Sequence, residues 1–276
     1  MSTDDVILTN FGGIVNNSLL NILCDDRNED NNDDEPNLIL HSSYVDGQSF
    51  RTNTKEYRKC FSILSTNIAT INAKFNELEL FVNDLFDIGF YFSAICIQES
   101  WLGSDDDLSL FQLKDYHCIS QGKSCSSKGG LIIYLHIHFD YKVIPANENS
   151  QEWECQLVEI RGKSLRKKVI LGNIYRPPRY TVEKYNHFTD QIRQTLLSLE
   201  RNRSEVVLAG DFNINLLAIL KKEAIGHFYE TMTSCSFSPC ITLPTRFSNN
   251  SASLIDNIFC KLSDIILNSI SGILID

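Results

Sequence analysis

The chain has 276 residues, of which 43% are hydrophobic and 22% are charged, and its formal net charge is −10. A chain of this length and composition can bury a large core, which excludes collagen, a coiled coil and wholesale disorder. No apolar run approaches the ~20 residues that cross a bilayer, the acidic start lacks a secretory signal pattern, and the nine cysteines include no CxxC pair. We therefore expect a protein of the cytoplasm or nucleus with no membrane partner.

Residues 1–56 carry most of the net negative charge. They hold 11 of the 35 acidic residues but three of the 25 basic ones, so the rest of the chain is almost neutral. The run Asp25–Asn37 is nearly all Asp, Asn and Glu, and such a run cannot bury a core. We predict an acidic, largely disordered leader over residues 1–56 and one domain over residues 57–276, whose charge does not exclude an anionic substrate.

From residue 61 onward, predicted strands alternate with predicted helices. Strands are predicted where apolar residues alternate or run together, and helices where they recur every three to four residues. The predicted strands are Phe61–Ile68, Ser93–Gln98, Gly130–His138, Trp153–Ile160, Val169–Tyr175, Glu205–Ala209 and Ser253–Cys260. The predicted helices are Lys74–Asp87, Val182–Leu199 and Glu223–Cys235. Consecutive hairpins between residues 130 and 175 disfavour a purely parallel sheet, so the pattern predicts a layered α/β sandwich.

Polar residues interrupt the ends of several predicted strands. A strand end is rigid, so a side chain placed there is held in position for catalysis. Each such residue is also an ordinary turn or capping residue, and for any one of them alone this alternative is favoured. The interrupting residues are Asn67, Glu99, Asn173, Tyr175, Asp211, Asn213 and Asp256. As a set they offer carboxylate and amide oxygens, which suit Mg²⁺.

Five strings around these residues follow one another in a characteristic order. They are Thr66-Asn67-Ile68, Ile97-Gln98-Glu99-Ser100-Trp101-Leu102, Gly172-Asn173-Ile174-Tyr175-Arg176-Pro177-Pro178, Gly210-Asp211-Phe212-Asn213 and Leu254-Ile255-Asp256-Asn257-Ile258-Phe259. In this order, over about residues 60–276, they resemble the endonuclease/exonuclease/phosphatase superfamily. Within it, the Asn-Ile-Tyr-Arg-Pro-Pro string, and Leu243-Pro244-Thr245-Arg246 ahead of Leu254, are similar to the apurinic-type endonuclease domain of LINE-like, non-LTR retrotransposons. The resemblance implies an α/β fold, a four-layer sandwich of two mixed β-sheets flanked by helices.

The resemblance also implies a Mg²⁺-dependent hydrolase that nicks DNA, with Mn²⁺ as an alternative ion. Glu99 is implied as the principal metal ligand, with Asn67 beside it. Asp211 is implied as the general base for the attacking water, Asn213 as the residue that holds this water or a phosphate oxygen, and Tyr175 as a contact of the scissile phosphate. The remaining members of the implied catalytic set are Asn173 and Asp256.

Phosphate contacts are expected to dominate the binding of DNA. Arg176, Arg179 and Thr245 are the candidate substrate-binding residues. Further candidates are Lys123, Lys128, Lys163, Arg166, Lys167 and Lys168, against the alternative that they are ordinary solvated side chains. We expect DNA as the partner, no stable protein partner, and a monomer.

The chain departs from the family pattern at its end. In the family, the aspartate at the position of Asp256 pairs with a histidine of a Ser-Asp-His string on a final strand. This chain ends at Asp276 before such a string, and none of its six histidines follows Asp256. The resemblance therefore implies a sandwich that lacks its last strand, in a fragment or degenerate copy of a mobile element. Two alternatives stay open: a catalytically inactive remnant that still binds nucleic acid, and a phosphatase or sphingomyelinase-like phosphodiesterase, against which the Tyr-Arg-Pro-Pro string argues.

Overall fold

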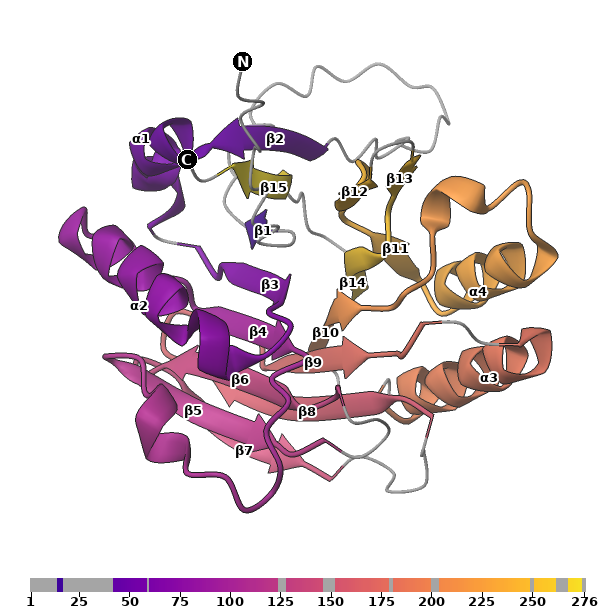
Figure 1. Cartoon of the computed structure of the whole chain (residues 1–276), viewed down its shortest axis with the longest axis horizontal. Coiled ribbons are helices and arrows are strands. Elements are labelled where there is room, and N and C mark those ends of the chain that lie inside the picture. Colours follow the sequence, from indigo (N-terminus) through magenta and orange to yellow (C-terminus); the bar gives the residue numbers. More distant parts are fainter. Residues whose placement is uncertain are drawn as a thin grey trace.

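Two β-sheets stack face to face, with helices on their outer sides (Figure 1). This architecture comes from a computed structural model, which describes residues 14–16, 42–58, 60–123, 128–145, 152–178, 181–199, 204–248, 251–261 and 268–274. Of residues 14–16, 56–57, 248 and 268–274, the backbone alone is described.

The first sheet is mixed and has seven strands within the described ranges. Their order across the sheet is β2 (Ser42–Asp46), β15 (Asn268–Leu274), β1 (Ile14–Asn16), β3 (Ile63–Asn67), β4 (Ala94–Gln98), β6 (Leu131–His136) and β5 (Tyr116–Gln121). Strands β3 and β4 are parallel, so Asn67 pairs with Gln98 and both strands end at the same edge. Strand β6 is antiparallel to β4 and therefore starts at that edge.

The second sheet is also mixed, with six described strands. Their order is β11 (Phe237–Pro239), β14 (Asp256–Lys261), β10 (Glu205–Asp211), β9 (Val169–Tyr175), β8 (Glu154–Arg161) and β7 (Asp140–Ile144). Strands β9 and β10 are parallel, and their last residues, Tyr175 and Asp211, are paired. Asp256 at the start of β14 and Glu154 at the start of β8 pair with these two residues, so one edge of the sheet collects all four.

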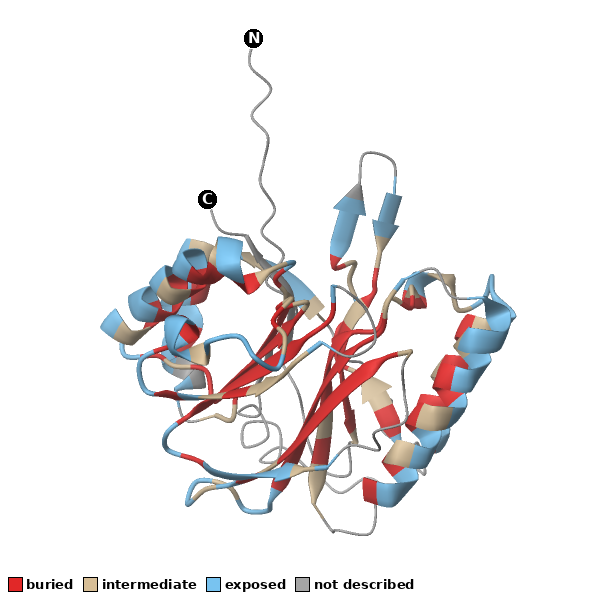
Figure 2. Ribbon diagram, turned by 60° about the horizontal axis from the view of Figure 1, so that its bottom comes forward, coloured by how far each residue is buried: buried red, intermediate tan, exposed pale blue. Residues whose placement is uncertain are grey.

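The helices cover the outer faces of the two sheets. The first sheet is covered by α1 (Gly47–Tyr57) and α2 (Ile71–Asp87), and the second by α3 (Val182–Leu199) and α4 (Glu223–Ser234). Two short 3-10 helices, η2 (Leu108–Phe111) and η4 (Leu216–Ala218), lie in the connections. Figure 2 shows the buried strands between helices whose outward sides are exposed, which gives four layers.

Alternation along the strands divides the core into three clusters. On β10, Val206 and Leu208 face the helices, whereas Ala209 faces the other sheet. Because successive side chains point to opposite faces of a strand, Asp211 also points between the sheets. The strand that carries this carboxylate is therefore packed on both faces, and the carboxylate itself is fully buried.

A small hairpin of β12 (Arg246–Ser248) and β13 (Ser251–Ser253) forms a third sheet among the described residues. It stands away from the body of the molecule (Figure 2). Its base is tied to β2 of the first sheet, because the hydroxyl of Tyr44 donates to the carbonyl of Pro244 at 2.6 Å. The ring centres of Tyr44 and Phe247 lie 6.0 Å apart.

The predicted leader over residues 1–56 needs correction at its end. Residues 42–46 form β2, and α1 begins at Gly47 with Asp46 as its N-cap, whose side chain accepts from the Ser49 amide at 2.7 Å. Phe50 is buried against Phe90 and Phe92, which gives α1 an aromatic anchor in the core. The acidic run of residues 25–37 lies outside the described residues.

The predicted elements agree closely with the observed ones in the body of the domain. The predictions over Val169–Tyr175 and Val182–Leu199 match β9 and α3 at both ends. Strand β7 was not predicted, because as an exposed edge strand it has no buried face to create an alternation. None of the helices in the described ranges has the length and hydrophobicity that crossing a membrane requires.

Candidate functional site

A single amide group connects the two sheets at the edge where the polar residues gather. The side-chain nitrogen of Asn67, at the end of β3, donates to Glu99 Oε1 at 2.8 Å and to Asp211 Oδ2 at 2.9 Å. Glu99 follows β4 of the first sheet and Asp211 ends β10 of the second. Two carboxylates that are 112 positions apart along the chain therefore share one partner, as the predicted site requires.

Glu99 lies on a loop in an unusual backbone conformation. Glu99 and Trp101 both have positive φ angles, 53° and 61°, which cost L-residues energy and persist where the surroundings impose them. The indole nitrogen of Trp101 donates to Glu99 Oε2 at 3.2 Å, so this loop supplies a partner for the oxygen that Asn67 does not contact. The carboxylate is thus oriented from two sides.

Asp211 is the fully buried carboxylate of the site. Its Oδ1 accepts from the backbone nitrogen of Asn213 at 2.9 Å, and Asn213 itself adopts a φ of 49° in the turn after β10. Burial raises the pKa of Asp211 well above its ordinary value, and the charge of Asp256 raises it further, while the hydrogen bond from Asn67 opposes this shift. The arrangement therefore favours a proton on Asp211 more than an exposed aspartate would.

Asp256 lies opposite Asp211 on the neighbouring strand. The Thr245 hydroxyl donates to Asp256 Oδ2 at 2.7 Å, while its oxygen accepts from the backbone nitrogens of Ile255 and Asp256 at 3.3 and 3.2 Å. Burial raises the pKa of Asp256, and the Thr245 hydrogen bond opposes this. Thr245, predicted to bind substrate, is 2% exposed and uses its hydroxyl to hold Asp256.

Arg176 does not occupy the position predicted for it. It is 2% exposed, and its guanidinium donates to the carbonyl of Phe212 from Nε and to the carbonyl of Asn213 from Nη2, both at 2.6 Å. The amide of Asn213 donates back to the carbonyl of Arg176 at 2.8 Å. The guanidinium also lies over the ring of Tyr185, 4.9 Å from its centre. Arg176 therefore clamps the turn after Asp211, because a planar fork matches two successive carbonyls.

Asn173 also differs from the prediction. It is fully buried, and its amide oxygen accepts from Gln98 Nε2 at 2.6 Å. Its amide nitrogen donates to the carbonyls of Ile97 and Ile132 at 3.0 and 3.1 Å. The whole amide is thus used to join the two sheets beneath the site, and Asn173 supports the site instead of facing a substrate.

Tyr175 lies at the end of β9, 2% exposed, between Asp211 and Glu154 in the strand pairing. Side chains of directly paired residues share one face of a sheet, so Tyr175 points to the same side as the two carboxylates. Arg179, the other arginine predicted to bind substrate, lies outside the described residues.

Sequence reasoning missed three residues of this region. Glu154 is 1% exposed at the start of β8. Trp101 contacts Glu99, and Arg246 is a positive charge that lowers the pKa of Asp211 and of Asp256. A charged residue inside the apolar strand Trp153–Ile160 is the pattern that could have identified Glu154, since charges are almost never fully buried without a partner.

The donor set fits a small divalent cation. Within the described residues, no three His, Cys, Asp or Glu side chains form a complete metal-binding group. Mg²⁺ does not require one, because it commonly binds through one or two carboxylates and keeps water and phosphate oxygens as its other ligands. Glu99 is partly exposed and offers such a carboxylate. The charge of Glu99 raises the pKa of Asp256, and the charge of Asp256 raises the pKa of Asp211. A cation beside Glu99 and Asn67 would offset this accumulation of negative charge.

Comparison with known proteins agrees with this geometry. The sequence profile of the Endonuclease/Exonuclease/phosphatase family matches residues 61–272, so the chain belongs to this family. Its members hydrolyse phosphodiester bonds as nucleases or act as phosphatases, and its nucleases are generally dependent on divalent metal ions. No curated protein matches the chain.

Solved structures share the fold at low sequence identity. An AP endonuclease from Leishmania major has 13% identity and a TM-score of 0.55, with 72% of this chain and 78% of that chain covered. An AP endonuclease from Archaeoglobus fulgidus has 14% identity and a TM-score of 0.51, with 72% and 86% covered. A mannosyl-6-phosphatase from Bacteroides thetaiotaomicron has 16% identity and a TM-score of 0.51, with 73% and 83% covered. The predicted superfamily and the predicted fold of two mixed sheets flanked by helices are therefore confirmed.

Proposed function

We propose that the protein is a Mg²⁺-dependent endonuclease that nicks DNA, of the kind found in LINE-like, non-LTR retrotransposons. The observation that carries the proposal is the side-chain nitrogen of Asn67, which donates to both Glu99 and Asp211 and so brings the two carboxylates together. Membership of a family of phosphodiesterases supports the reaction class. The Asn-Ile-Tyr-Arg-Pro-Pro string at residues 173–178 supports the retrotransposon type.

In this proposal, Glu99 would hold the metal ion through its carboxylate. Asn67 would do so through its amide oxygen, which here accepts from the backbone nitrogen of Ala69 at 3.1 Å. A bound divalent cation neutralises the charge that develops on the phosphate and on the leaving oxygen. Phosphoryl transfer needs positioning and charge stabilisation more than covalent chemistry. The strand ends and the hydrogen bonds to Glu99 meet this need, because they keep the carboxylate oriented before substrate arrives.

Asp211 is the proposed general base. Its carboxylate accepts a proton from water, the water oxygen bonds to phosphorus, and the bond between phosphorus and the leaving oxygen breaks, with solvent supplying the proton that this oxygen takes up. A raised pKa makes the ionised carboxylate a better proton acceptor than an ordinary aspartate. Asn213 and Tyr175 are proposed to orient the water and the phosphate, and Arg176 keeps the Asp211–Asn213 turn in place.

Nicking of supercoiled plasmid DNA tests this proposal. The wild-type protein should convert supercoiled to open-circular DNA with Mg²⁺ and not with EDTA, and Glu99→Ala should abolish the conversion. Glu205→Gln is a matched control, because Glu205 lies at the other end of the same strand as Asp211, where it pairs with Lys167. This variant should nick as wild type does.

The alternatives give different results in the same assays. Binding of DNA in a gel-shift experiment without any Mg²⁺-dependent nicking would identify an inactive remnant. Hydrolysis of phospholipid or inositol phosphate headgroups without nicking would identify a phosphatase or phospholipid phosphodiesterase. Either result would overturn the proposed function.

A further inference from the structure

We propose that Glu154 is a positioning residue for Glu99, acting through the Gly129–Gly130 turn. The inference rests on the proposed function, in which Glu99 is the metal ligand. Glu154 begins β8 of the second sheet, whereas the turn leads into β6 of the first sheet. The contact therefore also links the two sheets at the site, in addition to the links made by Asn67 and Asn173.

The first step is the contact between Glu154 and the turn. Glu154 is 1% exposed, and its Oε2 accepts from the backbone nitrogen of Gly130 at 2.6 Å. Hydrogen bonds to an ionised carboxylate are short and strong, and a buried carboxylate without such partners is costly. The turn is thus held by a buried carboxyl oxygen that accepts the amide hydrogen of Gly130.

The second step leads from the turn to the loop that carries Glu99. The backbone nitrogens of Ser100 and Trp101 donate to the carbonyls of Gly130 and Gly129 at 3.0 and 2.9 Å. These bonds fix the two residues directly after Glu99, in the stretch where Glu99 and Trp101 adopt positive φ angles. A strained stretch of this kind persists because its surroundings determine it.

The glycines show how closely these parts fit. A Cβ atom on Gly130 would lie 2.4 Å from Ser100 Oγ, and a Cβ atom on Gly129 would lie 2.1 Å from Glu154 Oε1. Gly130 also has a φ of 97°, which disfavours every other residue. The turn therefore lies in direct contact with Glu154 on one side and the Glu99 loop on the other.

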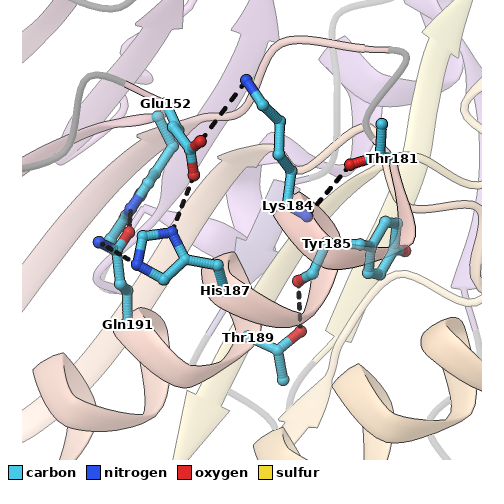
Figure 3. A network of polar contacts seen from close by, with 8 residues as sticks. Glu152, Thr181, Lys184, Tyr185, His187, Thr189 and Gln191 are labelled. Carbon is cyan, nitrogen blue, oxygen red and sulfur yellow. Dashed lines mark hydrogen bonds and ion pairs between the residues drawn. The ribbon is translucent and has the colours of Figure 1, made fainter.

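The neighbouring carboxylate, Glu152, has different partners and provides a control. It accepts from His187 Nδ1 at 2.9 Å and lies 3.5 Å from Lys184 Nζ, both on α3 (Figure 3). Gln191, in the same network, accepts from the indole of Trp153 at 2.5 Å. Glu152 and Glu154 thus stand two positions apart, but one holds helix α3 and the other holds the turn at the site.

The test compares Glu154→Ala, Glu154→Gln and Glu152→Ala in the full chain. Hydrogen exchange followed by mass spectrometry reports on the amides of Ser100 and Trp101, and electron paramagnetic resonance reports on the affinity for Mn²⁺. In Glu154→Ala we expect these amides to exchange at least ~10-fold faster and Mn²⁺ affinity to fall by about 10- to 100-fold, the range for groups that orient a metal ligand. Glu154→Gln keeps an acceptor for Gly130 and should restore both values to within ~3-fold of wild type, and Glu152→Ala should leave both unchanged.

Several outcomes would overturn the proposal. Unchanged exchange and Mn²⁺ affinity in a folded Glu154→Ala would do so, and so would an equal effect of Glu152→Ala. If circular dichroism shows that Glu154→Ala does not fold, Glu154→Asp decides, because its shorter side chain withdraws the acceptor and should accelerate exchange at Ser100 and Trp101 specifically. If Glu154→Ala accelerates exchange at these amides but the wild-type protein neither binds Mn²⁺ nor nicks DNA, the positioning role is kept and the proposed function is refuted.

Discussion

The charged residues at the two ends of the parallel strands β9 and β10 are arranged in opposite ways. Where the strands begin, Lys167 pairs with Glu205 at 2.6 Å and Lys168 with Glu159 at 3.4 Å, and both lysines are about half exposed. Where the strands end, Asp211 is buried beside Asp256, and the two carboxylates raise each other's cost of ionisation. At one end, opposite charges form solvent-exposed pairs, and at the other, two carboxylates lie together, of which Asp211 is fully buried.

This difference indicates which end carries the chemistry. Exposed ion pairs contribute little to stability. Buried like charges lower stability, and clusters of carboxylates with raised pKa values are characteristic of functional sites. The basic residues of the Lys163–Lys168 region lie at the end of the sheet remote from Asp211, so they are not beside the proposed site.

Asp211→Asn should give the largest effect. Removing the proposed base should lower the rate of plasmid nicking by about 10²- to 10⁴-fold. The free energy of unfolding should not fall, because the variant also removes the repulsion with Asp256. Nicking rates and urea unfolding at pH 8 measure the two quantities, with Glu205→Gln at the opposite end of β10 as control. A loss of stability that accounts for the loss of activity would contradict the assignment.

Arg176→Lys should give the next largest effect. Lysine cannot reproduce the two simultaneous hydrogen bonds to Phe212 and Asn213, so the turn that carries Asp211 should shift. A misplacement of a catalytic group by about 1 Å costs up to about 100-fold in rate. We expect kcat to fall while the affinity for DNA stays within ~3-fold of wild type. A variant that loses DNA affinity and keeps kcat would restore the substrate-binding role first predicted for Arg176.

The far end of the first sheet offers a test on stability. His136 is buried at the end of β6 and stacks on Tyr91, with ring centres 4.0 Å apart. The pKa of His136 is lowered from its ordinary 6.5 to about 4, chiefly by burial and also by the charge of His138, while Asp115 opposes the shift. The unfolded chain therefore binds this proton more readily, so the stabilisation is complete above pH 6.5 and is lost as the pH falls towards 4.

Lowering the pH from 7 to 5 should therefore reduce the free energy of unfolding by about 2 kcal/mol through His136. His136→Gln should lower the pH dependence of the free energy of unfolding by that amount in urea titrations. Nicking at pH 7.5 should not change, because the residue lies at the opposite end of its strand from the site. An identical pH dependence in the two proteins would show that His136 titrates normally.

The smallest effects concern lysines at the two ends. Lys128 lies over the ring of Trp101, 5.5 Å from its centre, beside Glu99. Lys128→Ala should weaken DNA binding a few-fold and lower the slope of its salt dependence by about one. Lys167→Ala, at the remote end, should change neither quantity. Fluorescence anisotropy with labelled duplex DNA at several salt concentrations measures both, and an equal effect of the two variants would remove the distinction between the ends.

The sequence was sufficient to predict the layers and the site edge, because alternation of apolar residues marks strands that are buried on both faces. It was also sufficient to bring Asn67, Glu99 and Asp211 together, since each directly follows or ends such a strand. The sequence did not show that β2 and α1 join the domain. The acidic run before them dominates the composition of residues 1–56, and α1 is anchored in the core mainly by one residue, Phe50, which forms no recognisable apolar pattern. The position of a residue at a strand end does not show how deeply its side chain is buried. For this reason Asn173 was assigned to the catalytic set and Arg176 to substrate binding, whereas both form hydrogen bonds inside the fold.

Mn²⁺ binding to the purified full chain, followed by electron paramagnetic resonance, tests the central claim most directly, because it asks whether Glu99 and its neighbours form a metal centre without requiring substrate. We predict that the wild-type protein and Lys167→Ala bind the ion with equal affinity, and that Glu99→Ala binds it at least ~10-fold more weakly. Equal binding by Glu99→Ala and the wild-type protein, or no binding by either, would contradict the account.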